Sequence, residues 1–128
     1  MIIKSVFKLN QPADQVYAML LDLDAVTPCI PGATVGAERL DGARDASVEV
    51  RFGPMRFNYA GTVRIAETDE DARRAVLQAT VNEESGEGDA KAQIEMQVVE
   101  LGPEESRVHV VNDLAITLGL SVFLPFHN

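Results

Sequence analysis

Few side chains in this sequence have the types and spacing that catalysis or metal binding requires. The chain contains two histidines, His109 and His127, and one cysteine, Cys29. It contains no HExxH or CxxC motif and no glycine-rich phosphate loop. A metal site needs clustered ligands, and none can be assembled from these residues. The sequence therefore predicts no catalytic set, no metal and no covalently bound cofactor.

The individual candidates have structural explanations. His109 alternates with valines, on the side of Arg107 and Val111, so we expect it to face solvent. Cys29 has no predicted basic partner, and we expect a packed thiol rather than a nucleophile. The acidic pair Asp22 and Asp24 is better explained by capping or by a place in a loop than by acid–base chemistry.

Composition limits the class of protein. A chain of 128 residues that is 46% hydrophobic is long enough for a single folded domain, which we place at residues 1–128. A net charge of −9 argues against nucleic acid as a partner. No stretch has the roughly 18 apolar residues that would span a bilayer. We expect a cytoplasmic domain.

Two kinds of element must position any site. Apolar residues recur at helical spacing over 14–22, and residues 24–29 add a further turn before Pro31. From residue 33 onward apolar and polar residues alternate, which together with an N-terminal strand predicts about seven antiparallel strands and an α+β fold. The expected strands are 3–9, 35–40, 47–52, 57–65, 75–81, 90–98 and 107–114.

The apolar face of this sheet mixes large and small side chains. The small residues either leave space between the sheet and a covering helix or admit a closely packed helix, and the sequence alone leaves both open. The small residues are Gly61, Ala75, Ala79, Ala90 and Ala92, and the large ones are Phe52, Phe57, Tyr59, Ile94 and Met96.

The order of these elements and several local motifs resemble the carbon monoxide dehydrogenase CoxG family of the START-like (SRPBCC) superfamily. The resemblance covers about residues 5–114, and the element Cys29-Ile30-Pro31-Gly32 is its most specific part. The other matching residues are Phe7, Leu9, Pro12, Val16, Leu20, Asp22, Gly53-Pro54, Gly61, Glu67–Asp71 and Asn112-Asp113.

The resemblance implies a helix-grip fold, in which a curved seven-stranded sheet encloses a long C-terminal helix and a cavity. It also implies an accessory protein that places a molybdenum-containing dehydrogenase at the inner face of the cytoplasmic membrane and binds a quinone. We expect Cys29, Ile30, Pro31 and Gly32 at the cavity rim or in contact with a partner. The expected cavity lining is Phe52, Phe57, Tyr59, Leu77, Ile94, Met96 and Val110, with Tyr59 as a hydrogen-bond donor.

The C-terminal segment departs from the family's pattern. Only LAITLGLSVFLPFHN follows Asp113, so we expect the C-terminal helix to be shortened after about residue 114. Residues 115–124 would form a helix of under three turns, because Pro125 opposes its extension. This apolar tail and the uncovered sheet face predict a homodimer or higher assembly.

Three functional hypotheses follow. The first is a non-catalytic protein whose cavity binds a quinone or another apolar molecule. The second is a recruitment factor that uses its surface, with the connection after Asp22 as a contact for a large enzyme or a membrane edge. The third is a lipid- or polyketide-binding or cyclase-type START-like protein, whose enzymatic form needs an ionisable group inside the cavity.

Overall fold

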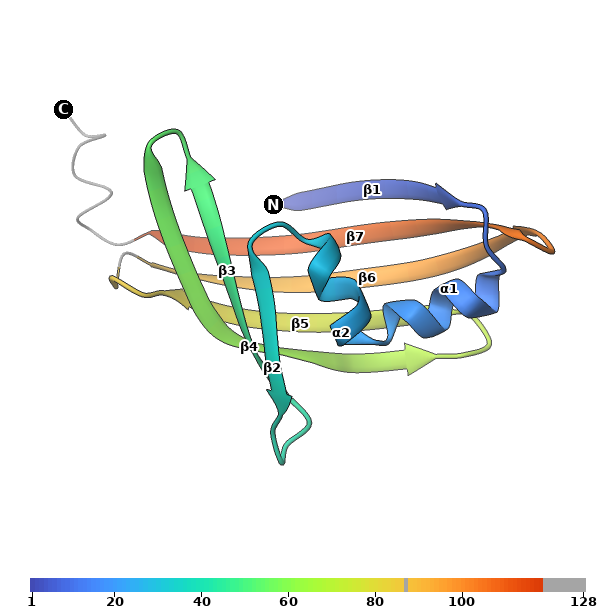
Figure 1. The fold of residues 1–128 in the computed structure, drawn as a ribbon, viewed down its shortest axis with the longest axis horizontal. Helices are drawn as coiled ribbons and strands as arrows, with labels where there is room; N and C mark the ends of the chain where they lie inside the picture. The colour runs from blue at the N-terminus through green and yellow to red at the C-terminus, as the bar shows by residue number, and fades with distance from the viewer. Residues whose placement is uncertain (87, 119–128) are drawn as a thin grey trace.

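The computed structural model describes residues 1–86 and 88–118, with only the backbone of Phe52 and Leu118. One strand, two short helices and a single 3-10 turn precede six further strands (Figure 1). The elements are β1 (Ile2–Leu9), α1 (Ala13–Leu20), α2 (Leu23–Val26), η1 (Thr27–Cys29), β2 (Ala33–Glu38), β3 (Arg44–Phe52), β4 (Met55–Asp69), β5 (Arg74–Glu83), β6 (Gly88–Gly102) and β7 (Glu105–Leu118).

The seven strands form one antiparallel sheet in the order β1-β7-β6-β5-β4-β3-β2. The first strand therefore pairs with the last, and β1 and β2 are the two edges. Figure 1 shows the sheet curving so that β2 and β3 cross the direction of β5–β7, with α1 and α2 on its concave side. The α+β helix-grip fold predicted from the sequence is confirmed.

The bend of the sheet lies in β4, which is 15 residues long. Residues 55–63 of β4 pair with β3, and residues 59–69 pair with β5, so the strand changes partners along its length. Gly61 lies in the middle of the shared stretch, and a bulge follows between Ile65 and Glu67. Glycine and a bulge are the usual means of bending a strand, because both relieve backbone crowding.

The hydrophobic core lies at one end of the concave face, beneath α1. Val16 and Ala13 of α1 are completely or almost completely buried there. The Tyr17 hydroxyl donates a 2.9 Å hydrogen bond to the Arg74 carbonyl, and Arg73 Nε lies 2.7 Å from Asp14 Oδ1. These contacts fix α1 to the start of β5. The sheet residues of the core are Ala75, Leu77, Met96, Val98 and Val108.

One prediction about the C-terminal region is wrong. Residues 115–118 were expected to begin a short helix, but they continue β7, which pairs with β6 as far as Leu118 opposite Gly88. Each of these residues pairs with a residue on β6, and this strand pairing outweighs the preference of the local sequence for a helix. The remainder of the expected helix lies outside the described residues.

Part of the concave face carries exposed apolar side chains. Ile3 and Phe7 of β1 are 44% and 55% exposed, and Ile116 of β7 is 51% exposed. Among the described residues, only α1, α2 and η1 cover this face. No helix in the described part of the chain is long and apolar enough to cross a membrane.

Candidate functional site

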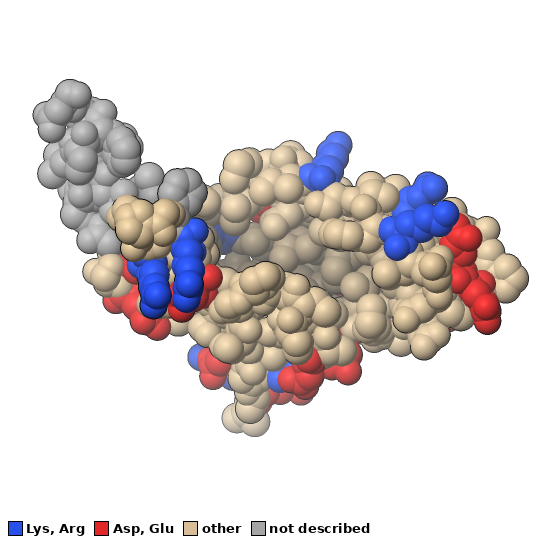
Figure 2. Space-filling model, turned by 45° about the horizontal axis from the view of Figure 1, so that its top comes forward, with Lys and Arg blue, Asp and Glu red and all other residues tan. Residues whose placement is uncertain are grey.

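A hollow of about 480 Å³ lies on the concave face, between the sheet and the segment that carries α2 and η1. Figure 2 shows the molecule hollowed along this face, with uncharged residues around the hollow and charged ones mainly toward the periphery. The lining residues are Leu23, Val26, Thr27, Ile30, Ala33, Thr34, Val35, Ala46, Ser47, Val48, Val50, Tyr59, Val63, Leu77, Ala79, Val81, Ala90, Ala92, Ile94, Leu114 and Ile116.

The floor of the hollow explains why there is space. Ala79 lies directly opposite Ala92 in the β5–β6 ladder, and Val81 lies opposite Ala90. The methyl side chains of Ala79, Ala90 and Ala92 rise little above the sheet and leave space over it. Ala75, in contrast, is 1% exposed because it lies in the core beneath α1. Both explanations of the small residues therefore hold, at different ends of the same sheet.

The polar groups of the hollow are few. The Thr27 hydroxyl donates to the Leu23 carbonyl at 2.6 Å, and the Thr34 and Ser47 hydroxyls bond to each other. The Tyr59 hydroxyl has no hydrogen-bond partner among the described residues, so it is free to donate to a ligand. An apolar site with one or two free polar groups is typical of small-molecule binding.

A further polar group lies beside the hollow. Asn112 on β7 stands opposite Ile94 of β6 and Ile3 of β1, and its buried Oδ1 has no partner among the described residues. A buried unpaired amide is costly unless something satisfies it. Asn112 was noted from the sequence only as part of a family motif, and it was not assigned to the site.

The structure brings together three of the seven residues expected in the lining. Tyr59, Leu77 and Ile94 line the hollow. Met96 lies in the core beneath α1, and Val110 packs against that core.

The remaining two expected residues belong to β3 and β4. Phe57 is half-buried on β4 and does not line the hollow. The side chain of Phe52 is outside the described residues. Most of the lining residues that sequence reasoning missed belong to strands, Val48 and Val63 among them. It also missed Leu23, Val26 and Thr27 of the covering segment, where strand alternation gives no signal.

Of the residues expected at the cavity rim, Ile30 lines the hollow and the others do not. Ile30 lines the hollow and is half exposed, which places it at the mouth. Gly32 has φ +78°, and its carbonyl accepts a 3.1 Å hydrogen bond from the amide of Glu49. Cys29 was expected to be packed, and this is wrong: it is exposed, because η1 lies at the surface and none of its three residues is buried.

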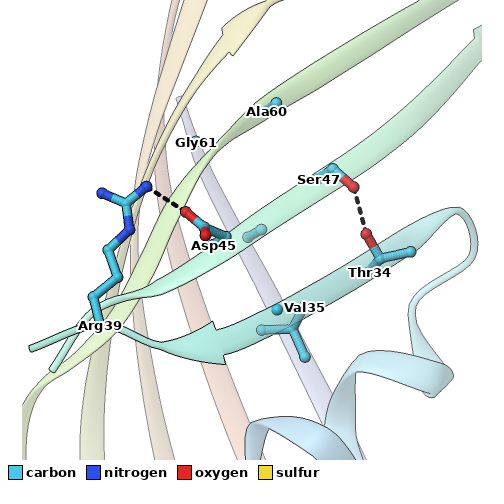
Figure 3. A pocket seen from close by; sticks show the side chains of 9 residues that line it. Thr34, Val35, Arg39, Asp45, Ser47, Ala60 and Gly61 are labelled. Atoms are coloured by element: carbon cyan, nitrogen blue, oxygen red, sulfur yellow. Dashed lines mark hydrogen bonds and ion pairs between the residues drawn. The ribbon is translucent and has the colours of Figure 1, made fainter.

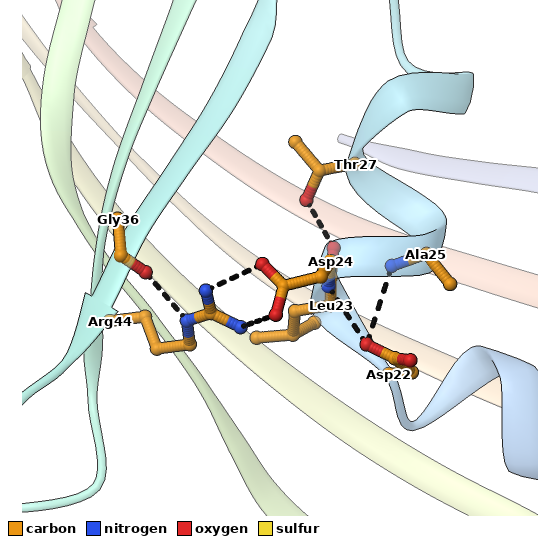
Figure 4. A network of polar contacts seen from close by, with 7 residues as sticks. All are labelled: Asp22, Leu23, Asp24, Ala25, Thr27, Gly36 and Arg44. Atoms are coloured by element: carbon orange, nitrogen blue, oxygen red, sulfur yellow. Dashed lines mark hydrogen bonds and ion pairs between the residues drawn. The ribbon is translucent and has the colours of Figure 1, made fainter.

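A polar network fixes the covering segment (Figure 4). Asp24 Oδ1 and Oδ2 accept hydrogen bonds of 2.7 and 3.2 Å from the two terminal nitrogens of Arg44, and Arg44 Nε donates to the Gly36 carbonyl at 2.7 Å. The hydrogen bonds from Arg44 lower the pKa of Asp24 below its ordinary value. The contribution of this pair to stability is therefore complete above the ordinary pKa of the carboxyl and is lost as the pH falls through the lowered value.

A second hollow of about 550 Å³ borders β2, β3 and β4 (Figure 3). Its polar side chains bond to each other: Arg39 pairs with Asp45, and Thr34 pairs with Ser47. Since these groups already satisfy one another, this hollow offers a ligand less than the apolar one does.

The described residues supply little for catalysis. None of the residues lining the apolar hollow is Asp, Glu, His, Lys or Arg. No group of three or more metal-ligating side chains occurs among residues 1–86 and 88–118. His109 stands opposite Val6 and Gln97 in the sheet, on the side away from the hollow.

Comparison with known proteins confirms the resemblance. The sequence model of the carbon monoxide dehydrogenase CoxG family matches residues 6–116. No curated protein matches the chain significantly.

Several solved structures share the fold. A conserved protein from Geobacillus kaustophilus superposes with a TM-score of 0.78 at 11% identity, over 94% of this chain and 78% of that protein. The Zhui aromatase/cyclase from Streptomyces sp. R1128 gives 0.62 at 14% identity, over 95% and 72%. A START superfamily protein from Mycobacterium smegmatis gives 0.58 at 15%, over 91% and 78%. At such identities these likenesses show the fold alone.

Proposed function

Because the chain belongs to the carbon monoxide dehydrogenase CoxG family, we propose that it is a non-catalytic accessory protein that binds a quinone or a similar isoprenoid molecule on its concave face. The observation that carries this proposal is the hollow of about 480 Å³. Its volume lies within the range of roughly 300–1,000 Å³ typical of small-molecule sites. Its walls are almost entirely aliphatic, and Tyr59 is the lining residue whose hydroxyl would donate to a carbonyl oxygen of the ligand.

A cyclase or hydratase function is less well supported. The fold is shared with an aromatase/cyclase. Such chemistry needs an acid or base inside the cavity, and the lining of this hollow contains no ionisable side chain other than Tyr59. Aliphatic walls suit binding and transfer rather than proton movement.

The binding proposal is tested with the full-length protein and a benzoquinone that carries a short alkyl or isoprenoid tail. We expect this quinone to raise the midpoint of thermal unfolding in a concentration-dependent manner, because a ligand that binds only the folded state stabilises it by mass action. Native mass spectrometry and solvent extraction of the purified protein would identify a co-purified apolar molecule. The absence of both a thermal shift and an extracted molecule would contradict the proposal.

We also propose that a second copy of the chain covers the exposed part of the concave face. Ile3, Phe7 and Ile116 are half exposed there, and β1 is a free edge strand. Burying these side chains in a symmetric contact is favourable, since monomers seldom expose large apolar patches. Light scattering at micromolar concentration should give the mass of a dimer or a higher assembly, and a stable monomer would contradict this expectation.

Recruitment of a molybdenum-containing dehydrogenase to the cytoplasmic face of the membrane is a further part of the proposal. Its support is family membership together with the exposed Ile30 and Pro31 at the mouth of the hollow. A protein that takes an isoprenoid from a bilayer must bring this mouth close to the lipid, at least transiently.

A further inference from the structure

We propose that the ion pair between Asp24 and Arg44 holds the covering segment, residues 22–31, closed over the apolar hollow and so sets the rate of ligand exchange. We call this segment the lid. The inference rests on the proposed function, because it concerns how the same hollow opens to an apolar ligand.

The lid forms one wall of the hollow. Leu23, Val26, Thr27 and Ile30 all project into it from α2, η1 and the residue that follows. Leu23 is 8% exposed, whereas Ile30 is 50% exposed. The lid therefore seals the hollow at its α2 end and leaves a mouth at Ile30. The hollow is also open on the sheet side, where Val50 and Ile116 are 39% and 51% exposed. A ligand seated against Leu23 and Val26 is released more readily when the lid moves away from the sheet.

Both ends of the lid are fixed to the sheet. Before the lid, α1 is tied to β5 by the Tyr17–Arg74 hydrogen bond and to Arg73 through Asp14. After the lid, the Gly32 carbonyl accepts from the amide of Glu49, at the start of the β2–β3 pairing. An ideal Cβ on Gly32 would lie 2.7 Å from the Glu49 carbonyl oxygen, so the chain approaches β3 as closely as it can.

Between these anchors, the hydrogen bonds of the lid are mostly internal. Asp22 caps α2 by accepting from the amides of Asp24 and Ala25 at 3.1 and 3.3 Å. Thr27 bonds to the Leu23 carbonyl at 2.6 Å. These contacts keep the lid helical, but they do not hold it to the sheet.

Among the described residues, the Asp24–Arg44 pair is the side-chain hydrogen-bonded contact that holds the lid to the sheet, in addition to the packing of Leu23 in the core. Arg44 belongs to β3, and its guanidinium makes two hydrogen bonds to Asp24 and a third to the Gly36 carbonyl of β2 (Figure 4). The third bond fixes the orientation of the guanidinium, so the two-pronged contact to Asp24 is preorganised. Arg44 is 18% exposed and Asp24 is 71% exposed, so dissolved salt reaches the pair and should loosen it.

The test compares Asp24→Asn with wild type, using N-phenylnaphthylamine as a fluorescent apolar probe. Release of the probe into excess lipid vesicles, followed by stopped flow, should be about threefold to tenfold faster in the variant, as expected for loss of one well-oriented ion pair. Release from wild type should also become faster as salt is raised. Arg44→Gln removes the same contact from the sheet side and should give the same increase, which separates the ion pair from any effect of Asp24 on α2 itself.

The matched control is Glu105→Gln. It breaks an exposed ion pair between β1 and β7, in which Lys8 Nζ lies 2.8 Å from Glu105 Oε1, and neither residue lines the hollow or contacts the lid. Its release rate should equal that of wild type. A release rate of Asp24→Asn equal to that of wild type, or an equal acceleration by Glu105→Gln, would overturn the inference.

A second measurement does not depend on a ligand. Amide hydrogen exchange over residues 22–31 should be faster in Asp24→Asn, while exchange over α1 stays at the wild-type level. If no probe binds but exchange in the lid increases selectively, the proposed function fails and the lid contact stands. If exchange in the lid is unchanged, the inference fails, whatever the hollow binds.

Discussion

Replacing Gly61 with alanine should cost the protein about 3 kcal/mol or more of its free energy of unfolding. Gly61 lies where β4 pairs with both β3 and β5. A Cβ at this position would overlap the Thr80 carbonyl oxygen and would lie 2.8 Å from the Cα of Val81. Both contacts are with backbone, so no side-chain rotation can relieve them. Urea or guanidinium unfolding followed by circular dichroism measures the loss.

Gly36→Ala is the matched control for this prediction. Gly36 lies on the edge strand β2, and a Cβ there would lie 3.3 Å from the Cβ of Asp45, a contact that a small shift can relieve. We expect it to cost less than about 1 kcal/mol. Equal stabilities of Gly61→Ala and wild type would mean that the close approach of β4 and β5 is not what bends the sheet.

Filling the floor of the hollow should abolish most ligand binding without unfolding the protein. Ala92 lies beneath the hollow, opposite Ala79 on one side and Leu114 on the other. A phenylalanine there would occupy space that the ligand needs. If it displaces roughly 100 Å² of buried ligand surface, at about 25 cal/mol per Å², affinity falls by about fiftyfold. Titration of the apolar probe measures this change.

Ala115→Phe is the control, because it adds the same ring one ladder position away on the opposite face. Ala115 pairs with Lys91 and is exposed. Its affinity for the probe should match that of wild type. Unchanged binding by Ala92→Phe would place the ligand elsewhere, and a loss of folded protein in both variants would show that the strands tolerate no aromatic ring here.

The fold could be predicted from the sequence because its signals are local and repeated. Strict alternation over residues 75–81 and 90–98 gives both the strands and their inward faces. Which part of that face is buried in the core and which part lines the hollow could not be predicted, because this depends on where α1 packs on the sheet. Met96 and Ile94 belong to one apolar face of β6, yet α1 covers the first and leaves the second open to the hollow.

The lid likewise contains a contact that could not be predicted from the sequence. Asp22 and Asp24 were expected to be capping or loop residues, and Asp22 does cap α2. Asp24 instead reaches Arg44, 20 positions along the chain. The partner of a charged side chain depends on how the sheet curves, and no periodicity in the sequence carries that information. The course of β7 beyond residue 114 was missed for a related reason, since it depends on how far β6 extends to pair with it, from Lys91 opposite Ala115 to Gly88 opposite Leu118.

The exposed position of Cys29 has a practical consequence for handling the protein. It is the chain's single cysteine, and it lies next to Ile30 at the mouth of the hollow. Air oxidation could therefore join two molecules by an intermolecular disulfide at this point. Such a covalent species would have the mass of a dimer without any contact between concave faces. Mass measurements should therefore be made in the presence of a reductant, or on Cys29→Ser.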